Sequence, residues 1–174
     1  MATVAYYRPT SLAEAARLAA ANPAARILAG GQSILPSLKL GLLAAEAFID
    51  LGAIAELQGI RTTGKSITIG AMTPHAAVAA SAEVRAMIPA LAALAGGIGD
   101  PQVRNRGTMG GSVANNDPAA DYPAAVVALN ATVTTNSRKI PADSFFKGLF
   151  ETALEDGELI TSISFPKVEK AAYM

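Results

Sequence analysis

The chain has no cysteine and only one histidine, His75. Cysteine thiolates hold iron–sulfur clusters and zinc fingers, so neither belongs to this chain, and disulfide bonds are excluded as well. A histidine-rich metal site is excluded for the same reason. The formal net charge at pH 7 is zero, because 14 acidic residues balance 14 basic ones. Nucleic-acid-binding proteins usually carry a basic surplus or a basic stripe, and this sequence shows neither.

Long apolar runs and targeting signals are absent too. No uninterrupted apolar stretch reaches the ~20 residues of a membrane-spanning helix. The first nine residues lack the basic and apolar regions of a signal peptide. With the absence of cysteine, this predicts a cytoplasmic protein. The 174 residues, 51% of them hydrophobic, suit one domain or two small ones around a shared cleft.

The first third of the chain alternates short strands with helices. Ser11 and Glu14 have the spacing of a capping box, which predicts a helix that runs to about residue 21. We expect strands over residues 4–7, 26–29 and 48–51, with one or two helical turns over residues 34–40. A strand, a helix and a strand at this spacing predict a small parallel β-α-β unit, which we assign to an N-terminal subdomain of residues 1–56.

From residue 57 the pattern favours antiparallel strands mixed with helices, and we assign residues 57–174 to a second α+β subdomain. A helix is expected to begin at Thr73 as cap and Pro74 as first helical residue. Residues 99–121 are rich in Gly, Asn, Asp and Pro and predict a long loop, of a length that is usually functional or disordered. The remaining expected strands span 57–62, 66–70, 131–135, 138–141 and 159–165, and the remaining helices span 87–95 and 122–129.

Two glycine motifs carry the strongest functional signal. The first is Ala29-Gly30-Gly31-Gln32-Ser33, and the second is Thr108-Met109-Gly110-Gly111-Ser112. Each joins a Gly-Gly turn to a small hydroxyl residue. Glycine lets backbone N–H groups approach a ligand without a Cβ in the way, and successive N–H groups form an anion site. Two such loops could clamp one diphosphate from both sides.

Other motif matches have simpler interpretations. Residues 59–66 fit the P-loop pattern, but the residues that follow alternate like a strand, which predicts a hairpin turn instead of a phosphate loop. The dinucleotide fingerprint G-x-G-x-x-G is absent, since Gln102 stands where the last glycine is needed. Asn130 begins a glycosylation pattern, yet without a signal peptide it is better interpreted as the start of a strand.

Two single residues keep more than one interpretation. His75 lies in the first turn of an expected helix, where a lone histidine is more often a surface or packing residue than a base or ligand. Asp121 directly precedes an apolar helix. It is interpreted either as the N-cap of that helix or as an acceptor for a sugar or ribityl hydroxyl.

The chain resembles the FAD-binding medium subunit of the molybdenum hydroxylases, the xanthine dehydrogenase and aerobic carbon monoxide dehydrogenase family. The resemblance runs over essentially the whole chain, and the stretch from Pro101 to Ser112 is its most specific part. The matching residues are Ala-Gly-Gly-Gln-Ser at 29–33, Gly-Ala-Met-Thr-Pro-His at 70–75, residues 101–112 and Asp-Pro-Ala-Ala-Asp at 117–121.

This resemblance implies an α+β flavoprotein fold of two subdomains with FAD between them. Residues 29–33 and 108–112 would bind FAD, mainly at its diphosphate. Asp121 would contact FAD hydroxyls, and Ile160 would lie beside the flavin. The chain would be part of an oxidoreductase in which a molybdopterin-binding large subunit oxidises the substrate. Electrons would pass through a [2Fe–2S] small subunit to this FAD and on to an external acceptor, in a dimer of heterotrimers.

Members of the family continue beyond the strand equivalent to 159–165 into a C-terminal subdomain, so we expect a chain that ends at Met174 to be a fragment or a truncated product. Two other hypotheses remain open. The chain could be an interaction or assembly remnant that holds no flavin, or a stand-alone flavin oxidoreductase, which would need an acid or base near the flavin. The residues identify neither the substrate nor the electron acceptor.

Overall fold

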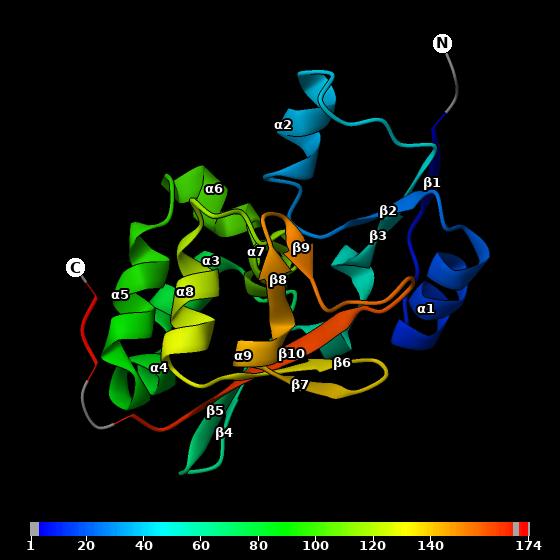
Figure 1. Cartoon of the computed structure of the whole chain (residues 1–174). Helices are drawn as coiled ribbons and strands as arrows, with labels where there is room; N and C mark the ends of the chain where they lie inside the picture. The colour runs from blue at the N-terminus through cyan, green and yellow to red at the C-terminus, as the bar shows by residue number, and fades with distance from the viewer. Residues whose placement is uncertain (1–3, 169–170, 174) are drawn as a thin grey trace.

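The computed structural model describes residues 4–168 and 171–173. Within them the chain forms a three-stranded sheet, a five-stranded sheet and a two-stranded ribbon (Figure 1). Parallel and antiparallel sheets together with helices make this the α+β fold that the sequence predicts. In the part of the chain that is described, no helix is both long enough and apolar enough to cross a membrane.

The three-stranded sheet confirms the expected β-α-β unit. Its strands are all parallel and lie in the order β1-β3-β2. The hydroxyl of Ser11 accepts the N–H of Glu14 at 3.3 Å and so begins the first helix, as the capping box predicts. The elements are β1 (Ala5–Tyr7), α1 (Leu12–Ala21), β2 (Ala25–Leu28), α2 (Ile34–Lys39) and β3 (Ala47–Asp50), followed by the short turns η1 (Leu51–Ala53) and η2 (Ala55–Leu57).

The five-stranded sheet is antiparallel, in the order β4-β5-β10-β6-β7. Residues 59–66, which fit the P-loop pattern, lie in its first hairpin. The N–H of Thr63 donates to the carbonyl of Ser66 at 3.0 Å, so the segment is a turn between two strands. The strands are β4 (Ile60–Thr62), β5 (Ser66–Gly70), β6 (Thr132–Thr135), β7 (Lys139–Pro141) and β10 (Ile160–Pro166), and the ribbon is β8 (Phe146–Gly148) with β9 (Glu151–Thr152).

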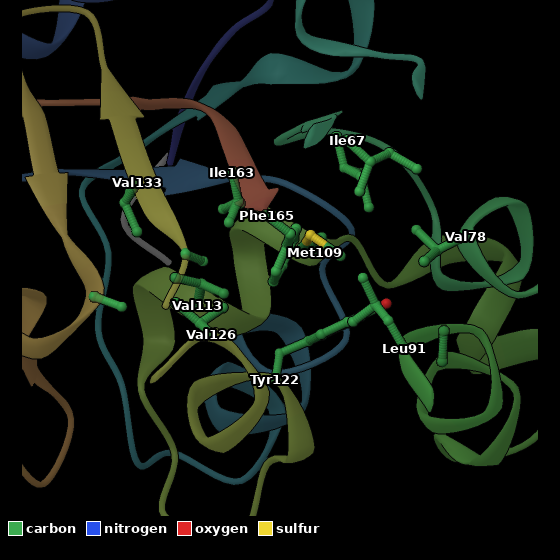
Figure 2. Close-up of a cluster of buried hydrophobic side chains, with 14 of the residues drawn as sticks. Ile67, Val78, Leu91, Met109, Val113, Tyr122, Val126, Val133, Ile163 and Phe165 are labelled. Carbon is green, nitrogen blue, oxygen red and sulfur yellow. The ribbon is translucent and has the colours of Figure 1, made fainter. Parts of the chain in front are cut away.

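Helices cover one face of this larger sheet and lie across the molecule from α1 (Figure 1). Alternate residues of β5 and β10, such as Ile67, Ile69 and Ile163, are fully buried against them. Figure 2 shows helical residues that complete this apolar core, among them Val113 and Tyr122. The helices are α3 (His75–Ala80), α4 (Ala82–Met87), α5 (Pro89–Gly97), α6 (Pro101–Arg106), α7 (Met109–Asn115), α8 (Asp121–Ala128) and α9 (Ala142–Phe145).

A second apolar cluster joins the two sheets. Ile49 and Ile54, from the first part of the chain, are fully buried with Leu57, Met72 and Leu159 from the second. The boundary at residues 56 and 57 therefore runs through a packed cluster, and the division into two subdomains stays a prediction. The packing fixes where β2 ends relative to β5 and β10, and the candidate site lies at that junction.

The long loop expected over residues 99–121 is wrong, because this stretch contains α6 and α7. The carboxylate of Asp100 accepts the N–H of Val103 at 2.8 Å and caps α6, and Pro101 occupies the first helical position. The hydroxyl of Thr108 accepts the N–H of Gly111 at 3.2 Å and caps α7. The polar capping residues and glycines of this stretch are also typical of loops, so the two short helices were not predicted.

Three helix starts also differ from expectation. Pro74, not Thr73, holds the cap position of α3, because the Thr73 hydroxyl instead bonds to the backbone of Gly59. Asp121 is the first residue of α8 and not its cap, a position that Ala120 takes without a side-chain bond. The helix expected over residues 87–95 is the end of α4 followed by α5, which begins at Pro89 because proline fits a first helical turn.

Candidate cofactor site

The first glycine motif follows the carboxyl end of β2, where Leu28 lies opposite Asp50 of β3. Open α/β sheets bind ligands at this edge. Gly31 has φ +77°, in the left-handed region that favours glycine. Within residues 4–168 and 171–173, no protein acceptor takes the N–H groups of residues 30–33. Four consecutive amides without a protein acceptor are available to donate to an anion.

The second glycine motif begins α7 and differs from the expected turn. Its amides are already bonded within the protein: the N–H of Met109 donates to the carbonyl of Thr73 at 3.2 Å, and that of Gly110 donates to the carbonyl of Ala71 at 2.8 Å. A Cβ on Gly110 would lie 2.5 Å from the Cβ of Ala71. The glycine is therefore needed for close packing, and the expectation that both motifs present free amides is wrong.

The two motifs are in direct contact, although about eighty residues separate them. A Cβ on Gly30 would lie 2.1 Å from the carbonyl oxygen of Arg106 and 2.8 Å from the Cα of Gly107. A Cβ on Gly111 would lie 3.2 Å from the Cβ of Ala29. The structure thus brings residues 29–33 and 108–112 together, with room for glycine alone at position 30.

Thr161, the residue after Ile160, is linked to the second motif through Ala71. The N–H of Ala71 donates to the carbonyl of Thr161 at 2.9 Å, and the carbonyl of Ala71 accepts from Gly110. The Ile160 side chain is buried in the larger core. A ligand at this junction would therefore meet the backbone of Ile160 more readily than its side chain.

Asp121 is half-buried in the first turn of α8, and its carboxylate accepts a hydrogen bond from the hydroxyl of Tyr173. That bond raises the pKa of Tyr173 above its usual value. A carboxylate at a helix N-terminus interacts favourably with the helix dipole, and its oxygens accept hydrogen bonds. Asp121 is also close enough to act electrostatically on His75 and Tyr122, which connects it to the second motif.

His75 is a buried residue of the site that the sequence did not assign to it. Its N–H donates to the carbonyl of Gly107 at 3.0 Å, so it holds the residue just before the second motif. Burial lowers the pKa of the imidazole to about 4, although the charge of Asp121 acts in the opposite direction. The packing interpretation of His75 is confirmed, and its position under Gly107 could be recognised only once residues 73–75 and 107–109 were seen side by side.

The fold and this junction define a protein that binds an anionic cofactor. The first glycine motif lies at the edge of the parallel sheet, where its glycine contacts residues 106 and 107, and Gly111 of α7 contacts Ala29. The donor set is backbone amide and hydroxyl, which suits a diphosphate. The residues present therefore fit the diphosphate of a dinucleotide cofactor such as FAD.

Comparison with known proteins gives the family. Residues 2–168 match the family described as FAD binding domain in molybdopterin dehydrogenase, and the chain belongs to this family. The resemblance inferred from the glycine motifs is thereby confirmed, and FAD is the cofactor that the family binds.

The chain is similar to the medium chains of two dehydrogenases. The chain is 43% identical over 166 residues to the carbon monoxide dehydrogenase medium chain of Hydrogenophaga pseudoflava, covering 92% of this chain and 58% of the relative. It is 39% identical over 168 residues to the glyceraldehyde dehydrogenase medium chain of Sulfolobus acidocaldarius, covering 94% and 60%. The chain therefore spans about 60% of the length of the relatives it matches.

Solved structures agree with the fold. A carbon monoxide dehydrogenase from Hydrogenophaga pseudoflava, lacking the Mo-pyranopterin moiety of its molybdenum cofactor, superposes with a TM-score of 0.93 at 42% identity, over 95% of this chain and 59% of the other. Quinoline 2-oxidoreductase from Pseudomonas putida 86 superposes with a TM-score of 0.93 at 34% identity, over 96% and 60%. The α+β flavoprotein fold is thus shown by both sequence and structure.

Proposed function

We propose that this chain is the FAD-binding electron-transfer part of a molybdenum hydroxylase. The observation that carries the proposal is the set of four amides at residues 30–33 that have no acceptor among the described residues, in a segment that contacts residues 106–111. When bound, FAD supplies a redox centre that accepts and passes on electrons. The protein binds and orients that centre, and the described residues suggest how.

Residues 29–33 hold the diphosphate in this proposal, because their N–H groups are free to donate. Residues 108–112 contribute close approach, since Gly110 and Gly111 keep side chains out of the junction. Asp121 accepts hydrogen bonds from ribityl or sugar hydroxyls of FAD. The backbone at Ile160 lies beside the flavin. Two subdomains, residues 1–56 and 57–174, would enclose the cofactor between them.

The partners are inferred from the family resemblance. The absence of cysteine agrees with it, because an iron–sulfur cluster bound by cysteine would then lie on another chain. We assign that role to a [2Fe–2S] small subunit, with a molybdopterin-binding large subunit that oxidises the substrate and an external acceptor after FAD. The relatives named as medium chains support an assembly of this kind, and a dimer of heterotrimers is the arrangement that we propose.

Titration of the purified chain with FAD tests the proposal. Bound oxidised flavin, with absorption bands near ~450 and ~375 nm, is expected for the wild type. Gly30→Ala and Gly111→Val should weaken binding by about tenfold or more, because each places carbon atoms in the contact between the motifs. Gly97→Ala is the matched control, since a Cβ there meets no atom within 4 Å.

Two results would overturn the assignment. A wild-type chain that stays colourless at saturating FAD would favour a remnant that no longer holds flavin. Equal FAD affinity in the wild type and in both glycine variants would place the diphosphate elsewhere. Turnover of a small substrate by the isolated chain would revive the stand-alone oxidoreductase.

A further inference from the structure

His75 lies at the point where three segments of the candidate site meet. Residues 73–75 run antiparallel to residues 107–109 through a β-bridge between Pro74 and Thr108. The N–H of His75 donates to the carbonyl of Gly107 at 3.0 Å, and the N–H of Met109 donates to the carbonyl of Thr73 at 3.2 Å. The backbone of residues 73–75 therefore supports the start of the second glycine motif.

The imidazole of His75 packs directly on Gly107. A Cβ on Gly107 would lie 2.6 Å from Nε2 and 2.9 Å from Cδ2 of His75, far inside a normal van der Waals distance. The absence of a side chain at Gly107 is thus what lets the imidazole fit. A displacement of the ring would be transmitted to Gly107, which ends α6, and to Thr108, which caps α7.

The imidazole of His75 also contacts the ring of Tyr122, the residue that directly follows Asp121. The ring centroids of His75 and Tyr122 are 5.2 Å apart with a tilt of 48°. Tyr122 is fully buried in the larger core, and Figure 2 shows its ring extending toward Leu91. The ring contact therefore connects the second motif to the first turn of α8, where Asp121 lies.

Packing, and not directed hydrogen bonding, holds this pair. Among the described residues, His75 Nδ1 and the Tyr122 hydroxyl have no hydrogen-bond partner, and both atoms are buried. Burial lowers the pKa of His75 and raises that of Tyr122 far above its usual value, so both rings are neutral at pH 7. The imidazole contacts Gly107 through its edge and lies next to the tilted ring of Tyr122, and in a close-packed interior such a side chain fixes the separation of the groups it contacts.

We propose that His75 is a positioning residue for FAD, whose imidazole sets the distance between Gly107–Thr108 and Asp121. This inference rests on the proposed function, in which the second motif meets the diphosphate and Asp121 meets the FAD hydroxyls. Both contacts belong to one rigid cofactor site, so a change in their separation weakens binding even when every contacting residue is intact.

The test is a set of three variants titrated with FAD by fluorescence quenching: His75→Ala, Gly107→Ala and the double variant. His75→Ala removes the imidazole and Gly107→Ala displaces it, and each should raise the Kd for FAD by about tenfold. In the double variant the added methyl group enters the space that the imidazole leaves. Its Kd should therefore rise by less than the product of the two single effects.

Val78→Ala is the matched control for stability. Val78 is on the same helix, fully buried in the larger core, and its truncation leaves a cavity away from the Gly107 contact. We expect its urea midpoint to fall to a similar degree while its Kd for FAD stays within about twofold of the wild type. His75→Ala and Val78→Ala with equal Kd values, or effects of His75→Ala and Gly107→Ala that simply multiply, would overturn the proposal.

The two proposals fail in different ways. If the wild type does not bind FAD, the proposed function is wrong, and if Gly30→Ala and Gly111→Val both bind FAD as well as the wild type does, the diphosphate lies elsewhere. If the wild type binds FAD and Gly30→Ala does not, while His75→Ala retains normal affinity, the site assignment stands and His75 is a core residue only.

Discussion

Lowering the pH from 7 to about 5 should destabilise the folded chain through the side chain of His75. His75 is the only histidine, and burial holds its pKa at about 4 in the folded state against 6.5 in the unfolded chain. Below pH 6.5 the unfolded chain therefore binds a proton that the folded chain does not. The stabilisation from the neutral imidazole is complete above pH 6.5 and is lost as the pH falls toward 4.

The magnitude follows from the two pKa values. One pKa unit corresponds to about 1.4 kcal/mol, so the difference between 6.5 and about 4 amounts to about 3 kcal/mol of unfolding free energy. The side chain is only 5% exposed, so solvent screening reduces this value little. For a small domain, 3 kcal/mol is a large part of the total stability. Burial is the main cause of the lowered pKa, and the charge of Asp121 opposes it and so reduces the loss.

Urea unfolding at pH 7, 6, 5 and 4 measures this loss, and His75→Gln is the control that lacks a titrating ring. The wild type should lose stability between pH 6.5 and 4, while the variant stays nearly level down to pH 5. Proton NMR gives an independent reading, because one histidine gives one imidazole Cε1–H resonance. Parallel pH profiles for the two proteins, or a resonance that titrates near pH 6.5, would refute the reasoning.

Three further substitutions test the supports of the fold. Glu158→Gln breaks the ion pair with Arg138 at 2.9 Å. The pKa of the Glu158 carboxylate is lowered to about 2, chiefly by its hydrogen bond from Arg138. Urea unfolding should therefore show about 2 kcal/mol of unfolding free energy lost at pH 7, and the stability of the variant should decline less than that of the wild type below pH 4.5. Asn116→Ala removes two bonds to the β8–β9 ribbon, at 2.8 and 2.9 Å, and amide exchange should become faster over residues 146–152 while β5 is unaffected. Asp100→Ala removes the cap of α6 and should lower the unfolding free energy by about 1 kcal/mol, with no loss if asparagine is placed there instead.

Capping residues and apolar periodicity were enough to predict the helices and strands whose local sequence favours the observed structure. The capping box at Ser11 and Glu14 places the start of α1, and the alternation of Ile67 and Ile69 places β5 at residues 66–70 as expected. The same alternation identified residues 59–66 as a hairpin despite their match to a phosphate-loop pattern. These are cases in which side-chain periodicity and the tertiary environment agree.

The stretch from residue 99 to 121 could not be predicted because its helices depend on contacts from elsewhere. Two of the first three residues of α7 are glycines, which disfavour a helix by about 1 kcal/mol each. The bond from Gly110 to Ala71 and the packing of Met109 in the core offset that preference. A sequence pattern shows the glycine and the missing side chain, but not the neighbouring strand that requires both.

The two glycine motifs show why a shared pattern does not imply a shared role. Gly30 and Gly31 follow a parallel strand, and their amides remain free because no strand or helix takes them. Gly110 and Gly111 follow the helix cap Thr108, so their amides are bonded before any ligand arrives. The first motif therefore supplies donors, and the second supplies proximity. An alanine at Gly30 or at Gly111 can reduce FAD binding. At Gly30 it would leave the N–H donors of the first motif present but push the two motifs apart.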